Sequence, residues 1–157
     1  AVILERMEHF EGALNHLRYE GKVHLGKNRE NVGEILRFFQ EKLIPHMQLE
    51  DNLFSYIEIH IPKLESVIRI LKAEHKVIKL NIEVLQFLLW EIAEEKSETK
   101  RMQIAEKLKD KGIYLIYLMR NHIQVEDESI YKSINQELHT EEKREILKRF
   151  KECQEQP

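Results

Sequence analysis

Two segments of the sequence carry the same pattern of metal-binding side chains. His46 and Glu50 lie in the segment HMQLED, and His122 and Glu126 lie in the segment HIQVED. A histidine and a glutamate four residues apart share one face of a helix, so both side chains can reach a single metal centre. The repeated pattern therefore predicts that each segment supplies one imidazole and one carboxylate to a metal centre.

The segments that precede these two also resemble each other. Glu8 and His9 are followed by Leu-Asn, and Glu74 and His75 are followed by Leu-Asn at the same offsets. The chain thus consists of two similar halves, each with a single-histidine helix and then a helix with histidine and glutamate. In chain order, the predicted metal ligands are His9, His46, Glu50, His75, His122 and Glu126.

Two histidines compete as the ligand from the first helix. His9 and His16 are seven residues apart, so they point to nearly the same side of that helix. His9 shares the Glu-His and Leu-Asn spacing with His75, which favours it. We therefore expect His9 to be the ligand and keep His16 as the alternative.

The chemistry of this ligand set follows from the cost of burying it. An unpaired carboxylate in an apolar seam costs roughly several kcal/mol or becomes neutral. Mixed nitrogen and oxygen ligands suit borderline divalent metals, iron foremost, and six ligands are too many for one tetrahedral zinc ion with an open position. We expect two iron ions bridged by Glu50 and Glu126, with room for an oxo or hydroxo bridge and a small ligand. Other divalent metals can occupy such a site in a purified sample.

Long helices must position these ligands, and apolar residues that recur every three or four positions predict them. The predicted helices cover, in order, about 2 to 21–26, 31–60, 64–95, 99–138 and 140–153. The predicted linkers are 26–30, 60–63 and 96–99. Because these linkers are short, we expect consecutive helices to be antiparallel neighbours.

The positions of the linkers agree with one common level for the ligands. In an antiparallel bundle, the turn between two ligands at the same level lies midway between them. The midpoint falls at 27–28 for His9 and His46, at 60–61 for His46 and His75, and at 98–99 for His75 and His122. Each midpoint lies in a predicted linker, so we expect the four histidines at one depth.

The composition fits one helical domain and excludes several classes of function. The chain has 157 residues, 34% of them charged, with only 5 glycines and 3 prolines. We expect an all-α, up-down-up-down four-helix bundle over about 1–138, with a short fifth helix, in a single domain over 1–157. The net charge of −3 argues against nucleic-acid binding, and the longest apolar run, 113–119, is too short to span a membrane. The single cysteine, Cys153, excludes a disulfide framework and agrees with a cytoplasmic location.

The ligand order H…HxxxE…H…HxxxE over four helices resembles the hemerythrin-like family, or HHE cation-binding domains. The resemblance covers about residues 1–138 and implies a non-haem di-iron centre. Carried over by position, it implies the ligands His46, Glu50, His75, His122 and Glu126, with His9 from the first helix. Members of the family bind oxygen or nitric oxide, sense oxygen or iron, or help to repair iron–sulfur clusters.

Two positions separate this chain from the oxygen-carrying hemerythrins. Those proteins have a second histidine where this chain has Lys79. They also use an aspartate five residues after the last histidine; this chain has Asp127 there, but Glu126 matches the H-x-x-x-E variant. The pattern is closer to the four-His, two-Glu members, which include iron–sulfur cluster repair proteins and an iron-sensing ubiquitin-ligase subunit domain.

The leading functional expectation is a non-enzymatic di-iron module, with no catalytic side chain beyond the metal ligands. Its partner is a small ligand such as O2 or NO, or it senses oxygen, iron or redox state. One alternative is a redox enzyme or iron donor, peroxidase-like or active in iron–sulfur cluster repair. The other is a metal-free helical interaction domain.

Overall fold

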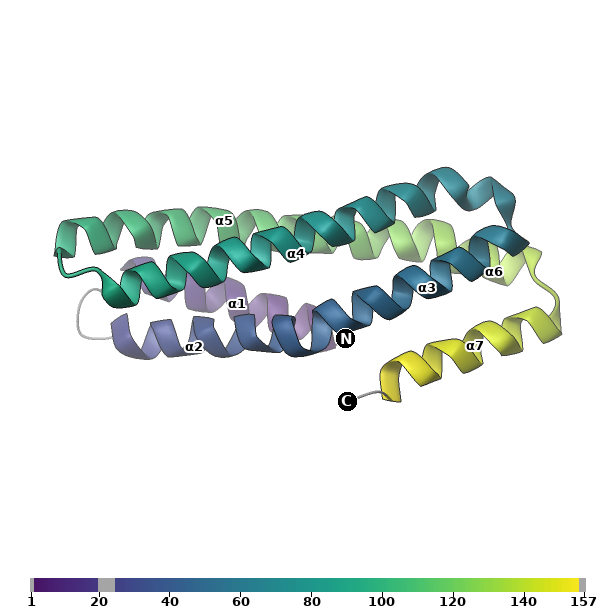
Figure 1. The fold of residues 1–157 in the computed structure, drawn as a ribbon, viewed down its shortest axis with the longest axis horizontal. Helices are drawn as coiled ribbons and strands as arrows, with labels where there is room; N and C mark the ends of the chain where they lie inside the picture. Colours follow the sequence, from purple (N-terminus) through teal and green to yellow (C-terminus); the bar gives the residue numbers. More distant parts are fainter. Residues whose placement is uncertain (1, 20–24, 156–157) are drawn as a thin grey trace. The chain divides into compact units, whose positions relative to one another are not determined.

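The computed structural model describes residues 2–19 and 25–155, with side chains for 3–14, 29–146, 148 and 149. Its elements are α1 (Val2–Tyr19), α2 (Leu25–Phe38), the π-helix η1 (Phe39–Leu43), α3 (Ile44–His60), the 3-10 helix η2 (Pro62–Leu64), α4 (Glu65–Glu94), α5 (Glu98–Val125), the π-helix η3 (Glu126–Tyr131), α6 (Lys132–Glu137) and α7 (Thr140–Glu155) (Figure 1). No strand occurs in these ranges, so the prediction of an all-α helical bundle is confirmed.

Most helix boundaries follow the prediction, but the start of the second helix was predicted wrongly. The expected linker at 26–30 lies inside α2, which begins at Leu25. Gly26 and Asn28 resemble a turn, yet such residues cost only about 1 kcal/mol or less each in a helix. The buried stripe of Val32, Ile35 and Leu36 in α2 outweighs that cost.

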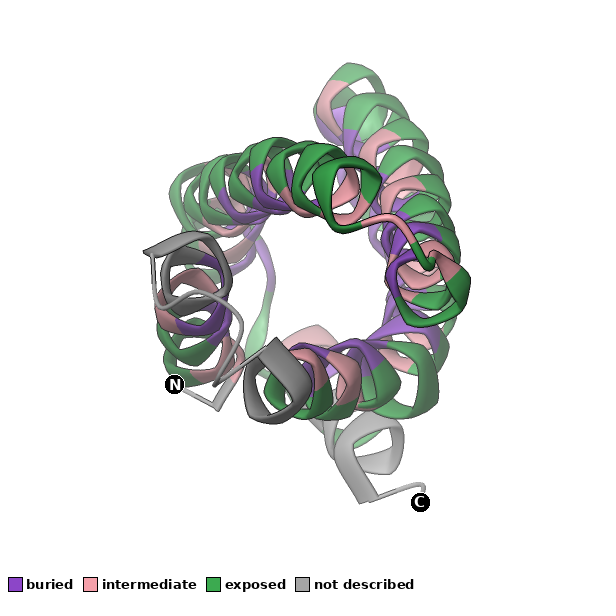
Figure 2. Ribbon diagram, turned by 90° about the vertical axis from the view of Figure 1, so that its left-hand side faces the viewer, coloured by how far each residue is buried: buried purple, intermediate pink, exposed green. Residues whose placement is uncertain are grey.

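The chain packs into two compact units. The first contains residues 1–40 and 78–120, and the second contains 41–77 and 121–157, so α4 and α5 contribute to both. Figure 2 shows that the buried residues lie along one side of the helices and the exposed residues along the other. This division follows from the apolar spacing of three and four residues in the sequence.

In the first unit, α1 packs against α2 and η1. The rings of Phe10 and Phe39 meet edge to face with their centroids 5.8 Å apart. The guanidinium group of Arg6 lies 4.8 Å from the centre of the Phe38 ring. These contacts place the middle of α1 beside the end of α2.

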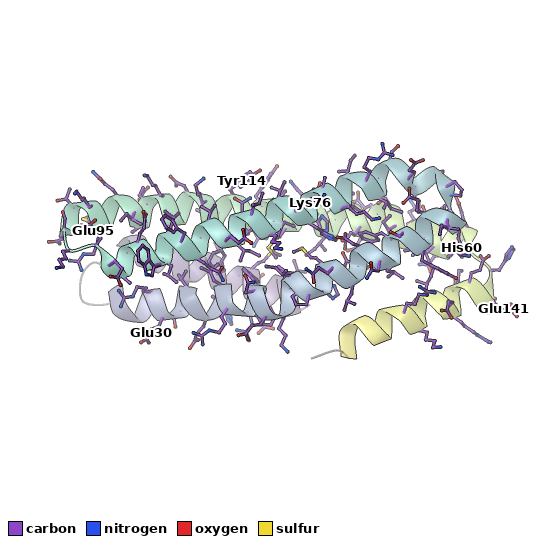
Figure 3. The ribbon with its side chains drawn as sticks, in the orientation of Figure 1. Glu30, His60, Lys76, Glu95, Tyr114 and Glu141 are labelled. Atoms are coloured by element: carbon purple, nitrogen blue, oxygen red, sulfur yellow. The ribbon has the colours of Figure 1, made fainter. Side chains whose placement is uncertain are left out.

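In the second unit, α3 packs against α7 around an apolar core. Among the fully buried core residues are Phe54 and Ile57 of α3, Leu71 of α4 and Ile130 of η3. Ile146 of α7 closes this core. His60 at the end of α3 and Glu141 at the start of α7 lie at the same end of the unit (Figure 3), so α7 runs back along α3.

Both π-helices adjoin the H-x-Q-x-E-D segments. The first, η1, ends two residues before Pro45, and the second, η3, begins at Glu126. A proline has no N–H group and its ring clashes with the carbonyl four residues earlier in an α-helix. The wider turn of η1 accommodates Pro45 without ending the helix, so α3 continues directly from it.

Candidate metal centre

Five of the six predicted ligands lie together in the second unit. The side chains of Glu50, His75, His122 and Glu126 are buried, and that of His46 is 27% exposed. One nitrogen or oxygen atom from each of the four buried side chains lies within 4.8 Å of those of the others. The repeated spacing explains part of this locally, because the histidine of each H-x-Q-x-E-D segment lies one helical turn from its glutamate. His75 comes from a separate helix, α4.

Imidazole nitrogens and carboxylate oxygens face one another in this cluster. Nε2 of His46 is 3.0 Å from Oε2 of Glu50, and Nε2 of His75 is 3.2 Å from Oε1 of the same glutamate. Nε2 of His122 is 2.7 Å from Oε1 of Glu126 and 2.9 Å from Nε2 of His75. Glu50 thus directs one oxygen to each of two imidazoles, which is the arrangement of a bridging carboxylate.

The second ring nitrogen of each buried histidine has a carboxylate partner. Nδ1 of His75 is 2.7 Å from Oδ1 of Asp51, and Nδ1 of His122 is 2.7 Å from Oε2 of Glu74. Because a carboxylate only accepts hydrogen bonds, each Nδ1 carries a proton and donates it. In a neutral imidazole, Nε2 is then unprotonated and its lone pair faces the cluster.

The cluster therefore contains more acceptors than protons. With neutral imidazoles, the Nε2 lone pairs of His75 and His122 oppose each other, and Oε1 of Glu126 is buried without a hydrogen-bond donor. His122 Nε2 is close to this oxygen but has no proton to give it. Added protons or a metal cation must neutralise these atoms, and two imidazoles with two carboxylates form a donor set that fits a divalent cation.

The pKa values in the metal-free cluster show the same demand for positive charge. Burial alone would lower the pKa of His75, but the neighbouring carboxylates of Glu126 and Glu50 outweigh it and raise the pKa to about 10. The pKa of His46 is raised, chiefly by its hydrogen bond to Glu50. Burial acts to raise the pKa of Glu50, but its histidine partners hold that pKa well below the ordinary value. Burial raises the pKa of Glu126, and there the neighbouring histidines do not outweigh the effect of burial.

Three residues beside the cluster were missed by the sequence analysis. Asp51 and Glu74 hold the imidazoles, and Tyr131 is half-buried, with a pKa raised by burial and then by the charges of Glu50 and Glu126. The signal for two of them was present in the repeats. An aspartate follows glutamate in both H-x-Q-x-E-D segments, and a glutamate precedes histidine in both Glu-His pairs.

His9 lies in the first unit, where it faces residues of α2. A pocket of about 360 Å³ is lined by Arg6, Glu8, His9, Asn31, Glu34 and Ile35, among others. The turn expected at 26–28, which supported the placement of His9 at the level of His46, is helical instead. That supporting argument was wrong, and His9 remains a predicted ligand only. The side chain of His16 lies outside the described residues.

Comparison with known proteins identifies the family of this sequence. Residues 3–134 match the family described as the hemerythrin HHE cation binding domain, a range that includes every predicted ligand. No curated protein and no solved structure matches the chain. Among the described residues, no helix is long and apolar enough to cross a membrane.

Proposed function

Since the chain belongs to the hemerythrin family of HHE cation-binding domains, we propose that its buried cluster holds two non-haem iron ions. We further propose that this centre binds O2 or NO, or senses oxygen, iron or redox state. The observation that carries the proposal is the convergence of Glu50, His75, His122 and Glu126, with more acceptor atoms than protons. The proposal that the metal is iron rests on the resemblance to the four-His, two-Glu members of the family.

The two ions are proposed to have unequal ligand sets. Glu50, His75, His122 and Glu126 would hold the first ion, because their ligand atoms already lie close together. His46 and the second oxygen of Glu50 would contribute to the second ion. Its remaining protein ligands would be the second oxygen of Glu126, which bridges the two ions as Glu50 does, and a histidine from the first helix, as predicted for His9. We therefore propose that the first ion is held more tightly than the second.

The surroundings of the cluster suit a centre that excludes bulk water. The fully buried ring of Phe54 stacks on His75 with ring centroids 5.9 Å apart. The raised pKa of Tyr131 keeps its phenol neutral beside the carboxylates. Low polarity strengthens charge interactions inside the site. An iron pair supplies redox chemistry and open positions for a small ligand.

Metal analysis and optical spectroscopy test this proposal. We expect about two iron ions per chain after anaerobic loading, as the predicted ligand set implies. The reduced protein should show a spectral change with O2 or NO that reverses when the gas is removed. Iron loading below one ion per chain, in protein with full helical circular dichroism, would contradict the metal centre and leave a helical interaction domain. The His122→Ala variant is the control, since it lacks a buried ligand.

The exposure of His46 favours one alternative, a redox enzyme or iron donor. A second ion at this more exposed position would be easier to release or to reach than the first. Rapid irreversible oxidation by O2, or transfer of one ion per chain to a chelator much faster than the other, would support this function over reversible binding. Reversible spectra with two equally slow transfer steps would contradict it.

A further inference from the structure

We propose that Asp51 and Glu74 are positioning residues that fix the tautomer and the orientation of His75 and His122 for metal binding. The inference rests on the proposed metal centre. Neither carboxylate belongs to the predicted ligand set. Each contacts the side of an imidazole that faces away from the cluster, so it acts on the metal only through the histidine.

The geometry of the two contacts is the same. Each joins a histidine Nδ1 to a carboxylate oxygen over 2.7 Å, which is typical of a charge-assisted hydrogen bond. Asp51 of α3 directly follows Glu50 and reaches across to His75 of α4. Glu74 directly precedes His75 and reaches across to His122 of α5. Both α3 and α4 therefore offer a predicted ligand and, beside it, a carboxylate that holds the ligand of the next helix.

The burial pattern explains why these carboxylates can do this work. The imidazole side chains are only 4% and 7% exposed, whereas Asp51 is 36% and Glu74 is 26% exposed. The two carboxylates therefore reach solvent while the rings stay within the core. An ionised acceptor on Nδ1 keeps the proton there, which leaves Nε2 free to bind a cation and makes it more basic.

Loss of either acceptor has a defined consequence. Without it, the ring can rotate or place its proton on Nε2, and that proton would then point at the metal position. Removal of an orienting hydrogen bond of this kind typically lowers metal affinity about 10–100-fold. Because Asp51 and Glu74 act on different histidines, we expect the effects of the two changes to multiply.

Paired variants separate the charge of each carboxylate from its acceptor oxygen. Asp51→Asn and Glu74→Gln keep an acceptor oxygen, whereas Asp51→Leu and Glu74→Leu remove it. Glu58→Leu on α3 and Glu83→Leu on α4 are the matched controls, since neither residue contacts the cluster. Anaerobic Co(II) titration against a chelator, with visible spectra and circular dichroism, measures affinity, coordination and folding.

We expect Co(II) affinity to fall about 10–100-fold in each leucine variant, less in the amide variants, and not at all in the controls. In Zn(II)-loaded protein with 15N-labelled histidine, NMR should show protons on Nδ1 and metal on Nε2 of His75 and His122. If a leucine variant does not fold, the corresponding amide variant and the NMR assignment decide. A purely structural role would lower stability without changing the Co(II) spectrum or the coordinating nitrogen.

Two different failures are distinguishable in this experiment. Wild-type protein that binds neither Co(II) nor Zn(II) would overturn the metal centre and the positioning role with it. Wild-type protein that binds these metals through Nδ1, or with an affinity that the four variants leave unchanged, would overturn the positioning role and leave the metal centre intact.

Discussion

The segments HMQLED and HIQVED share one pattern but have different surroundings in the folded chain. The side chain of His122 is buried and donates its Nδ1 proton to Glu74, whereas that of His46 is partly exposed and contacts Glu50 through Nε2. Glu50 has a lowered pKa, and Glu126 has a raised one. An internal repeat therefore predicts which residue types recur, while the neighbouring helices decide what each residue does.

The repeat assigns the counterpart of Glu74 to the first unit. By the repeat, the residue equivalent to Glu74 is Glu8, which would hold His46 as Glu74 holds His122. Within the first unit, Glu8 lines the pocket together with His9. The second unit by itself thus contains a complete set of partners around His122 and only part of such a set around His46.

The largest expected effect comes from removing one histidine of each segment in turn. We expect His122→Ala to lose nearly all iron, and His46→Ala to keep about one ion per chain, because His46 belongs only to the second ion's ligands. In metal-free protein, His122→Ala should also reduce the free energy of unfolding by about 1–3 kcal/mol, since it leaves buried polar groups without their partner. Iron analysis and urea unfolding measure both effects, and equal iron loss in the two variants would contradict the unequal sites.

A rise in pH should lower the stability of the metal-free protein and raise its affinity for metal. The pKa of His75 is raised to about 10, so protonation of this ring stabilises the metal-free protein fully below about pH 6.5. This contribution is lost as the pH rises towards 10. Co(II) affinity should rise over the same range, because the metal must displace the proton. Urea unfolding and Co(II) titration at pH 6.5, 8 and 10 test this, and parallel trends would contradict it.

A smaller effect on metal content is expected from the first helix. We expect His9→Ala to lose the second ion and keep the first, and His16→Ala to keep both. Iron retention during dialysis against a weak chelator measures the difference. Loss of iron only in His16→Ala would make His16 the ligand, and full retention in both variants would remove the first helix from the centre.

The smallest effect on metal content is expected from a change in the first unit. Gly112 of α5 lies so close to Leu14 of α1 that an added Cβ would overlap its side chain. We expect Gly112→Val to lower the free energy of unfolding by about 1–3 kcal/mol through overpacking. Iron per folded chain should stay at the wild-type value. A loss of iron at full helicity would show that the first unit controls the centre more directly than proposed.

The sequence predicted the features that depend on regular spacing. The seams of α4 and α5 repeat every three or four residues, and both helices begin and end within two residues of the expected positions, with η3 and α6 completing the last long helix. The pairing of each repeated histidine with its glutamate was predicted from the repeat, because one-turn spacing is a local property. The meeting of Glu50, His75 and His122 from three helices was predicted from the midpoints that fall in the linkers 60–63 and 96–99. The roles of Asp51 and Glu74 depend on contacts between helices, which spacing alone does not specify.

The start of α2 and the π-helices illustrate the other limit. Gly26 and Asn28 have weak helix propensity, and such a preference does not decide a boundary once a buried stripe follows. A signal for η3 was present, since Glu126, Ile130 and Ile134 recur in steps of four, without the step of three that an α-helical seam requires. Buried residues that repeat only every four positions favour the wider turn of a π-helix.

The wider turn at η3 keeps Glu126 and the core residues that follow it on the same face of the helix. In a regular α-helix, side chains four residues apart rotate by about 40° relative to each other, so successive steps of four would soon leave the core. The additional backbone residue in η3 resets this drift, and Ile130 and Ile134 remain buried below Glu126. Deleting one residue from 127–129 would rotate the residues that follow by about 100° around the helix axis. Ile130 and Ile134, which anchor the end of the chain in the core, would then no longer lie on the same face as Glu126.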